Sequence, residues 1–132
     1  MIDVQPIFII AAEQPKELAE FYRLICGGVI SRGFHSDHYS ITYNQPFKIE
    51  IFKPNRNKNV LKQKKSSCAI CFQKASSPKP FNEIQKWSTE MIKFGAVLVD
   101  GPHEEKFGAE AWMSDPEGNQ FLIWVPFLSQ GS

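Results

Sequence analysis

The chain has 132 residues, of which 42% are hydrophobic and 22% are charged, and its formal net charge at pH 7 is +1. This length is enough for one domain with a buried core. A nearly neutral chain offers no general electrostatic attraction to nucleic acid or to a membrane surface. No apolar run approaches the roughly 18 residues of a membrane span.

The first half of the chain predicts one strand, one helix and three further strands. The apolar run at 7–10 predicts a buried strand. Pro15 favours a helix start, and an apolar stripe at helical spacing continues to a stop at Gly27-Gly28. Strands are then expected at roughly 29–34, 38–43 and 47–53, with a turn at 44–46.

The second half repeats this order. Residues 69–72 predict a strand, and the prolines at 78 and 80 open a helix that ends at Gly95. One face of this helix is expected to carry Ile84, Trp87, Ser88, Met91 and Phe94. Strands are expected at about 96–100, 108–114 and 120–125, with a tight turn at 115–119.

An internal duplication explains this repetition. A shift of 72 residues superposes 49–54 on 121–126. The predicted fold class is α+β, with two tandem βαβββ modules in a single domain, 1–132. Module one covers about 1–54, a basic linker about 55–66, and module two about 67–128. Residues 53–67 carry lysine and arginine without acidic residues; the pattern favours a solvated linker over a patch for an anion or RNA, because no aromatic residue interleaves the charges.

Three stretches resemble the vicinal oxygen chelate superfamily of glyoxalases, bleomycin-resistance proteins and extradiol dioxygenases. Residues 18–22 running to Gly27-Gly28 resemble its first helix, 101–108 its loop before the seventh strand, and 114–119 its most recognisable hairpin. The resemblance implies curled mixed sheets with the helices outside, a cavity on the inner face and, in many members, a homodimer. Its activities range from lyases and isomerases to metal-free drug-binding proteins, so the fold does not settle the function.

Metal-dependent members of the superfamily hold a divalent ion with His, Glu or Gln from the first and fourth strands of each module. The matching positions here fall near Ile7, at Glu50, at about Ala69 and at Leu122. Only Glu50 is a possible ligand, and one carboxylate cannot hold Zn²⁺, Ni²⁺ or Fe²⁺. We therefore expect neither a metal nor another cofactor.

Two other groups of residues have ligand chemistry. His35, Asp37 and His38 are compatible with a metal site, but a polar turn explains them without one. Cys68 and Cys71 form a lone CxxC on a predicted strand, where such residues point to opposite faces. We expect two ordinary buried thiols there. With three cysteines the chain has no disulfide framework, and with no basic leader it fits a reduced, cytoplasmic protein.

Strand alternation predicts which side chains line the cavity. In 108–114 the helices should be faced by Ala109, Ala111 and Met113, and the cavity by Glu110, Trp112 and Ser114. Their counterparts after the shift are His38, Ser40 and Thr42. In the superfamily the metal-ligand positions of the fourth and eighth strands point into the cavity. By the same alternation, the side chains that point inward here are Lys48, Glu50, Phe52, Gln120, Leu122 and Trp124. Hairpin pairing should place Ser40 opposite Glu50 and Trp112 opposite Leu122.

Three functions compete for this cavity. The favoured one is a metal-free binding protein for an aromatic or cationic small molecule, with the ligand contacted by His38, Ser40, Glu50, Phe52, Trp112, Gln120 and Trp124. The second is a lyase, isomerase or dioxygenase that uses Glu50 as general base or metal ligand, with His38 as its partner. The third is a structural or regulatory dimer whose cavity is filled by its own side chains. Each residue also has a plainer interpretation: the two tryptophans only fill the barrel, Glu50 pairs with Lys48, and His38 is a residue of the rim. The ligand itself is not identified by the sequence.

Overall fold

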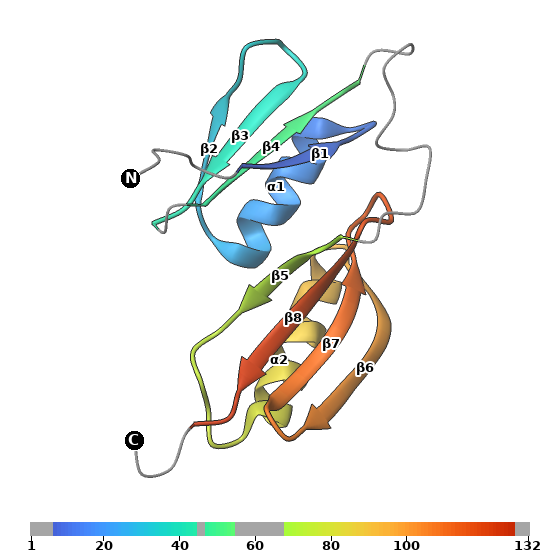
Figure 1. Cartoon of the computed structure of the whole chain (residues 1–132). Helices are drawn as coiled ribbons and strands as arrows, with labels where there is room; N and C mark the ends of the chain where they lie inside the picture. The colour runs from blue at the N-terminus through green and yellow to red at the C-terminus, as the bar shows by residue number, and fades with distance from the viewer. Residues whose placement is uncertain (1–6, 45–46, 55–67, 129–132) are drawn as a thin grey trace. The chain divides into compact units, whose positions relative to one another are not determined.

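The computed structural model describes residues 7–44, 47–54 and 68–128, which form eight strands and two helices. The chain divides into two compact units, unit 1 at Met1–Ser66 and unit 2 at Ser67–Ser132. Each unit follows the order strand, helix and three strands (Figure 1). This order confirms the α+β class and the two tandem βαβββ modules. The linker at about 55–66 lies outside the described residues, as does part of the turn at 44–46.

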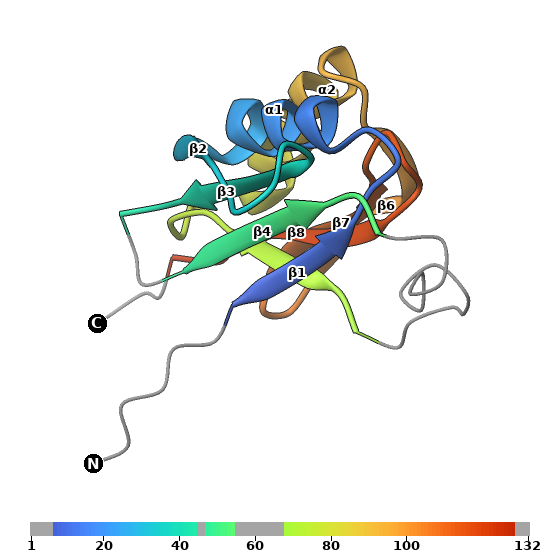
Figure 2. The same ribbon diagram turned by 90° about the horizontal axis from the view of Figure 1, so that it is seen from above.

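Unit 1 is a four-stranded mixed sheet with a helix on one face. Its elements are β1 (Phe8–Ala11), α1 (Pro15–Cys26), β2 (Val29–Arg32), β3 (His38–Thr42) and β4 (Lys48–Phe52). The strand order is β1-β4-β3-β2, with β1 parallel to β4 and the other pairs antiparallel. In Figure 2 the helix α1 lies along one side of these strands.

Unit 2 has the same topology. Its elements are β5 (Ile70–Gln73), α2 (Pro80–Lys93), β6 (Val97–Glu105), β7 (Gly108–Ser114) and β8 (Gln120–Pro126). The strand order is β5-β8-β7-β6, and β5 runs parallel to β8. Two sheets of identical order support the internal duplication. Within the described residues, neither helix is long and apolar enough to cross a membrane.

The helices begin and end where local chemistry indicates. Pro15 and Pro80 lie in the first turns of α1 and α2, where a missing backbone N–H costs nothing. In α1 the Gly27 N–H donates to the Arg23 carbonyl at 2.9 Å, and Gly27 has a positive φ of 76°. A glycine takes this conformation without the steric penalty of a Cβ, so the helix stops there.

Both predicted hairpin registers are confirmed. Ser40 pairs with Glu50 in β3–β4, and Trp112 pairs with Leu122 in β7–β8. The side chains turned to the helices are fully buried, and those with 0% exposure include Ile41, Ile49, Ile51, Ala109, Ala111, Met113 and Ile123. Alternate residues of the same strands therefore lie on the opposite face of each sheet.

The expected strand at 96–100 is wrong in its length. Strand β6 continues to Glu105, through residues expected to form a loop, and pairs with β7 as far as Glu105 opposite Gly108. The register shifts on both sides of Asp100, between Leu98 and Asp100 and between Asp100 and His103. Pro102 cannot donate a backbone hydrogen bond, and it lies within this irregular stretch, where the ladder does not need one.

Three expectations of burial are also wrong. Phe94 follows the last residue of α2 and is 42% exposed, because the helix ends before Phe94 can turn inward. Cys68 and Cys71 are exposed rather than buried. The strand expected at 7–10 is buried on one face only, since Ile10 is buried and Ile9 is exposed. β1 and β5 are edge strands of their sheets, which leaves these side chains less covered than a central strand would.

The predicted turn between β7 and β8 is organised by Asp115. This residue is 2% exposed, and its Oδ1 accepts from the backbone N–H groups of Glu117 at 2.8 Å and Asn119 at 3.0 Å. Its Oδ2 accepts from Asn119 Nδ2 at 2.8 Å. Gly118 has a φ of +88° and donates its N–H to the Asp115 carbonyl. The buried carboxylate of Asp115 therefore fixes the turn, and the turn sets the register of β7 and β8.

We predict that Asp115→Ala lowers the free energy of unfolding by about 2–4 kcal/mol, because it leaves buried donors without an acceptor. Pro116→Ala, one residue along in the same turn, is the matched control and should cost less than about 1 kcal/mol. Urea unfolding followed by circular dichroism measures both. Equal destabilisation by the two substitutions would contradict the role assigned to Asp115.

Candidate functional site

Each sheet has one face beneath its helix and a second face without one, which we call the open face. The register pairs define the open face of unit 1, since paired residues share a face. Its members are Ile9, Ala11, Val29, Ser31, His38, Ser40, Thr42, Lys48, Glu50 and Phe52. In unit 2 the corresponding members are Cys71, Gln73, Val97, Asp100, His103, Glu105, Gly108, Glu110, Trp112, Ser114, Gln120, Leu122, Trp124 and Pro126.

In unit 1 three titratable side chains converge. His38 Nε2 lies 3.5 Å from Glu50 Oε1, and Lys48 Nζ lies 3.7 Å from the same oxygen. The side chains of His38 and Glu50 are only 14% and 16% exposed. Lys48 therefore compensates the charge of Glu50 within the chain itself, so Glu50 is not the unpaired carboxylate that a cationic ligand requires.

The loop before β3 orients the His38 ring. The Phe34 backbone N–H donates to His38 Nδ1 at 3.1 Å. A ring nitrogen that accepts a hydrogen bond carries no proton, so the neutral ring carries its proton on Nε2, the atom that faces Glu50. Glu50 Oε2 is buried and has no hydrogen-bond partner among the described residues. This oxygen is free to accept a proton or a hydrogen bond.

The four site residues predicted in the first module thus share one open face. His38 is the register partner of Phe52, and Ser40 is the register partner of Glu50. Ser40 is buried at 7% exposure, while Phe52 is half-buried. The structure places His38 against Glu50, where the sequence had left open an isolated residue at the rim. The sequence could not show the contribution of Phe34, which comes from its backbone.

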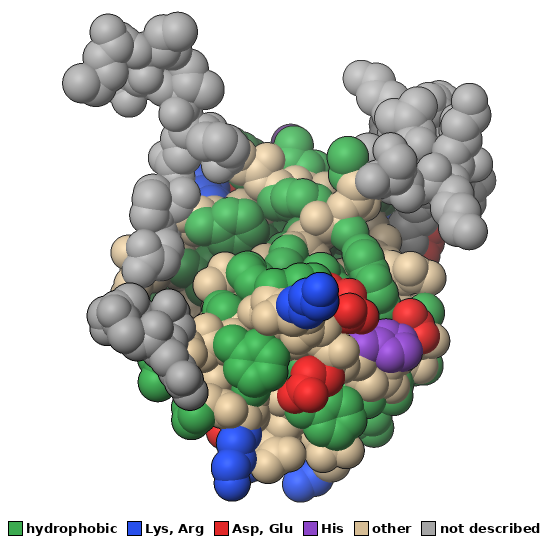
Figure 3. Space-filling view, turned by 60° about the horizontal axis from the view of Figure 1, so that its bottom comes forward, with side chains coloured by type: hydrophobic (Ala, Val, Ile, Leu, Met, Phe, Trp, Pro, Cys, Tyr) green, Lys and Arg blue, Asp and Glu red, His purple; other side chains and the backbone are tan. Residues whose placement is uncertain are grey.

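In unit 2 the open face is aromatic. Trp112 and Trp124 are half-buried, and Gln120 is exposed at the start of β8. The Phe107 ring meets Trp124 edge-on, with centroids 6.1 Å apart and planes at 68°. Trp124 Nε1 is buried without a hydrogen-bond partner among the described residues. Exposed apolar side chains occur in both units, and Figure 3 shows hydrophobic side chains in green among charged ones on one face.

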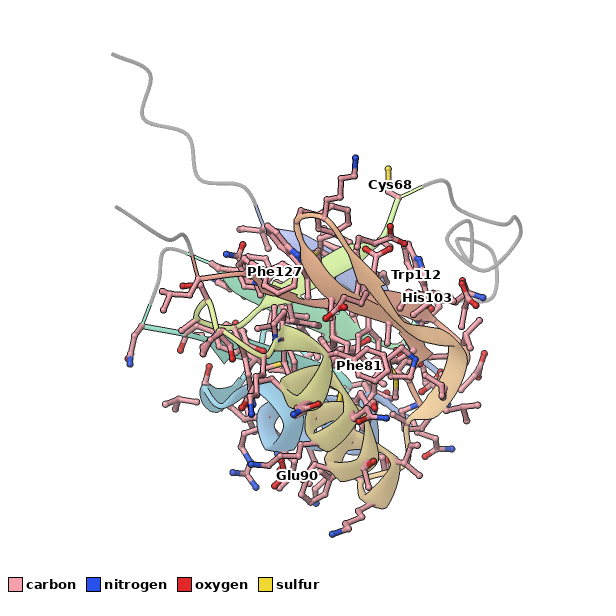
Figure 4. All side chains as sticks on the ribbon, turned by 90° about the horizontal axis from the view of Figure 1, so that it is seen from below. Cys68, Phe81, Glu90, His103, Trp112 and Phe127 are labelled. Carbon is pink, nitrogen blue, oxygen red and sulfur yellow. The ribbon has the colours of Figure 1, made fainter. Side chains whose placement is uncertain are left out.

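Strand β6 adds acidic residues to this face. Asp100 pairs with Trp112, and His103 pairs with Glu110. His103 Nε2 lies 3.1 Å from Asp100 Oδ1. This hydrogen bond is the largest cause of a raised pKa for His103, and the charges of Asp100, Glu105 and Glu110 add to it. Figure 4 shows Trp112 and His103 at the β6–β7 side of unit 2 and Glu90 on α2.

The donor atoms on the open faces do not fit the divalent metal of the resembling superfamily. The parallel registers pair Glu50 with Ile9 and Leu122 with Cys71. Ile9 and Cys71 lie two residues after Ile7 and Ala69 and on the same faces. Of these four side chains, only the Cys71 thiol could bind a metal. Among residues 7–44, 47–54 and 68–128, no three His, Cys, Asp or Glu side chains gather in a metal-binding group.

Comparisons with known proteins identify the fold. No protein-family model matches the sequence, and no curated protein does either. Solved structures match over nearly the whole chain at low identity. A glyoxalase/bleomycin resistance protein/dioxygenase family enzyme from Burkholderia phytofirmans is 16% identical, with 92% of this chain and 97% of that chain covered and a TM-score of 0.70.

Two further structures show the same fold with different named functions. The antibiotic-binding protein TnmS3 from Streptomyces is 16% identical, with 96% and 97% of the two chains covered and a TM-score of 0.64. Lactoylglutathione lyase from Agrobacterium tumefaciens is 14% identical, with 94% of each chain covered and a TM-score of 0.60. This chain therefore has the glyoxalase/bleomycin-resistance/dioxygenase fold, which the sequence motifs had indicated.

We predict that His103 titrates above its ordinary pKa of 6.5. Because the folded pKa is raised, protonation of His103 stabilises the fold. That stabilisation is fully present below about 6.5 and is lost as the pH rises through the folded pKa. NMR titration of the imidazole measures it. Asp100→Asn should lower the pKa towards 6.5, whereas Glu104→Gln, on the opposite face of β6, should leave it nearly unchanged. An unshifted wild-type value would contradict the Asp100 contact.

Proposed function

From the glyoxalase/bleomycin-resistance/dioxygenase fold of this chain, we propose that the protein binds a small molecule, without a metal ion, on the open face of a sheet. One observation carries this proposal: Trp112 and Trp124 share an open face that no helix of unit 2 covers. They are diagonal neighbours across β7 and β8, a separation that aromatic side chains can span. Among the described residues, the ring contact of these indoles is the edge-on one between Phe107 and Trp124, and both tryptophans are half-buried, so part of each side chain is exposed.

Polar atoms on the two open faces support the same proposal. Trp124 Nε1 is a buried donor without a partner among the described residues, and Glu50 Oε2 is a buried acceptor in the same condition. A buried polar group without a partner costs about 1–3 kcal/mol, which a ligand with complementary groups recovers. Micromolar affinity requires about 8 kcal/mol, and aromatic contacts supply roughly 0.5–1.5 kcal/mol per pair. Polar contacts and apolar burial must therefore provide the larger share.

The proposal involves the residues selected from the sequence on each open face, which are His38, Ser40, Glu50 and Phe52 in unit 1 and Trp112, Gln120 and Trp124 in unit 2. An antibiotic-binding protein with the same fold supports a small molecule as the ligand. A homodimer and a cytoplasmic location remain part of the proposal, on the strength of the resemblance and of the cysteine content. The linker is not assigned a role in it.

A second candidate function is favoured by the contact between His38 and Glu50. A carboxylate with one free oxygen, next to a neutral imidazole that presents its Nε2–H, has the parts of a general base and a hydrogen-bond donor. This arrangement suits a lyase or isomerase that transfers a proton. Lys48 opposes the use of Glu50 as a metal ligand, because its ammonium group already lies against the carboxylate.

We predict that protein purified without chelators contains well below one equivalent of Zn, Ni, Mn or Fe per chain. The physical reason is that hydrophobic or thiol side chains accompany Glu50 and Leu122 at the paired positions. Elemental analysis of the purified protein measures the metal content. A value near one equivalent would favour the metal-dependent enzyme and contradict the metal-free binding protein.

We predict that a thermal-shift screen of small aromatic and cationic compounds gives hits that quench tryptophan fluorescence. Trp112→Ala should weaken their binding roughly tenfold or more, because it removes one wall of the site. Trp87→Phe is the matched control: Trp87 lies on α2 and is 6% exposed, away from the open face. Hits that bind Trp112→Ala as tightly as the parent chain would place the site elsewhere.

A further inference from the structure

The open faces of the two modules differ in charge. In unit 1 the opposite charges of Lys48 and Glu50 form an ion pair. No other lysine, arginine or carboxylate occupies the paired open-face positions of this unit. In unit 2, three carboxylates share the face, namely Asp100, Glu105 and Glu110, with His103 among them. No lysine or arginine occupies any of the paired open-face positions of β5, β6, β7 and β8. The aromatic face therefore carries net negative charge.

Glu110 is the carboxylate best placed to meet a ligand. It pairs with Trp124 in β8, lies two residues from Trp112 in β7, and pairs with His103 on its other side. It is half-buried, whereas the Asp100 side chain is 62% exposed. Across the sheet Glu110 is close enough to Cys71 to contribute, after burial, to the raised pKa of that thiol. The register places Glu110 directly opposite Trp124 on the neighbouring strand.

Glu110 also has no neutralising partner among the described residues. No hydrogen bond or ion pair joins it to another side chain there, since the His103 ring is bonded to Asp100 instead. A half-buried carboxylate beside two indole rings, opposite a histidine that is bonded to Asp100 and not to it, lacks a permanent cation among the described residues. Glu50 differs in this respect, because Lys48 already lies against it.

We propose that the open face of unit 2 binds an organic ammonium ion, a methylated amine or a cationic aromatic molecule, with its charge next to Glu110 and its methyl or ring groups on Trp112 and Trp124. This inference rests on the proposed function and names its ligand class. Indole faces attract cations through the ring quadrupole, and methylated ammonium groups lose little hydration on contact with them. An inorganic cation does not fit, because indole rings supply no ligand atoms and no group of three ligating side chains gathers among the described residues.

Two probes of equal shape test the charge requirement. The cation is (4-hydroxyphenyl)trimethylammonium, and its neutral counterpart is 4-tert-butylphenol, in which a carbon replaces the nitrogen. Titration calorimetry with the full chain at low ionic strength measures both dissociation constants. The cation should bind roughly fivefold tighter or more, which is the range expected of a partly exposed cation–π and carboxylate contact. Added salt should reduce this preference.

Three variants locate the charge. Glu110→Gln should bring the two dissociation constants together with little effect on the neutral probe. Glu104→Gln removes the same charge from the opposite face of β6, where Glu104 pairs with Ala109, and should leave the preference unchanged. Glu50→Gln removes the carboxylate of the unit 1 face, and it is the variant that would lose the preference if the anchor lay there instead.

The outcomes separate this inference from the proposed function. Equal binding of both probes, weakened by Trp112→Ala, would overturn the ammonium site and retain the small-molecule site. Loss of the preference in Glu50→Gln but not in Glu110→Gln would overturn the assignment to unit 2. If neither probe binds at millimolar concentration, the ammonium inference is wrong, while neutral hits of the thermal-shift screen decide the proposed function independently.

Discussion

The alternation of side chains along the two hairpins, β3–β4 and β7–β8, governs both the core and the candidate site. With Ser40 opposite Glu50, the isoleucines at 49 and 51 lie beneath α1 at 0% exposure. A slip of one residue would carry Glu50 to the helix side and the isoleucines to the open face. A carboxylate buried there without a partner would cost several kcal/mol. The hydrophobic core and the open-face polar groups therefore demand the same register.

Both copies of the duplicated module keep this register, whereas the residues on their open faces differ. Both units keep the same strand order and the same hairpin registers. Their open faces have diverged. Unit 1 presents His38, Lys48 and Glu50 in a compensated polar cluster. Unit 2 presents Trp112 and Trp124 beside Asp100, which is bonded to His103, and beside Glu110, which has no bonded partner among the described residues. Open-face positions do not pack against the helix, so substitutions there alter binding chemistry at little cost to folding. This is how one scaffold carries several functions.

The irregular strand β6 contributes chemistry that its regular counterpart β2 lacks. In a regular strand Asp100 and His103, three residues apart, would point to opposite faces. The register shifts around Asp100 turn both to the open face, where they meet at 3.1 Å. A bulge in an edge strand thus re-aims two side chains towards Trp112 and Glu110. The acidic character of the unit 2 face depends on this local irregularity.

Much of this architecture follows from the sequence alone, because its causes are local. Period-two alternation marks Trp112 and Trp124 as sharing a face, and the turn at Asp115 sets their register with β8. The exposure of Cys71 and Ile9 was not foreseen, because a pattern of apolar residues does not tell an edge strand from a central one.

Only the tertiary structure decided which charges are compensated. The contact of Lys48 with Glu50 depends on the length of the two side chains. The hydrogen bond from the Phe34 N–H to His38 comes from a loop backbone, and the contact of Asp100 with His103 comes from a bulge. None of these features leaves a periodic pattern in the sequence.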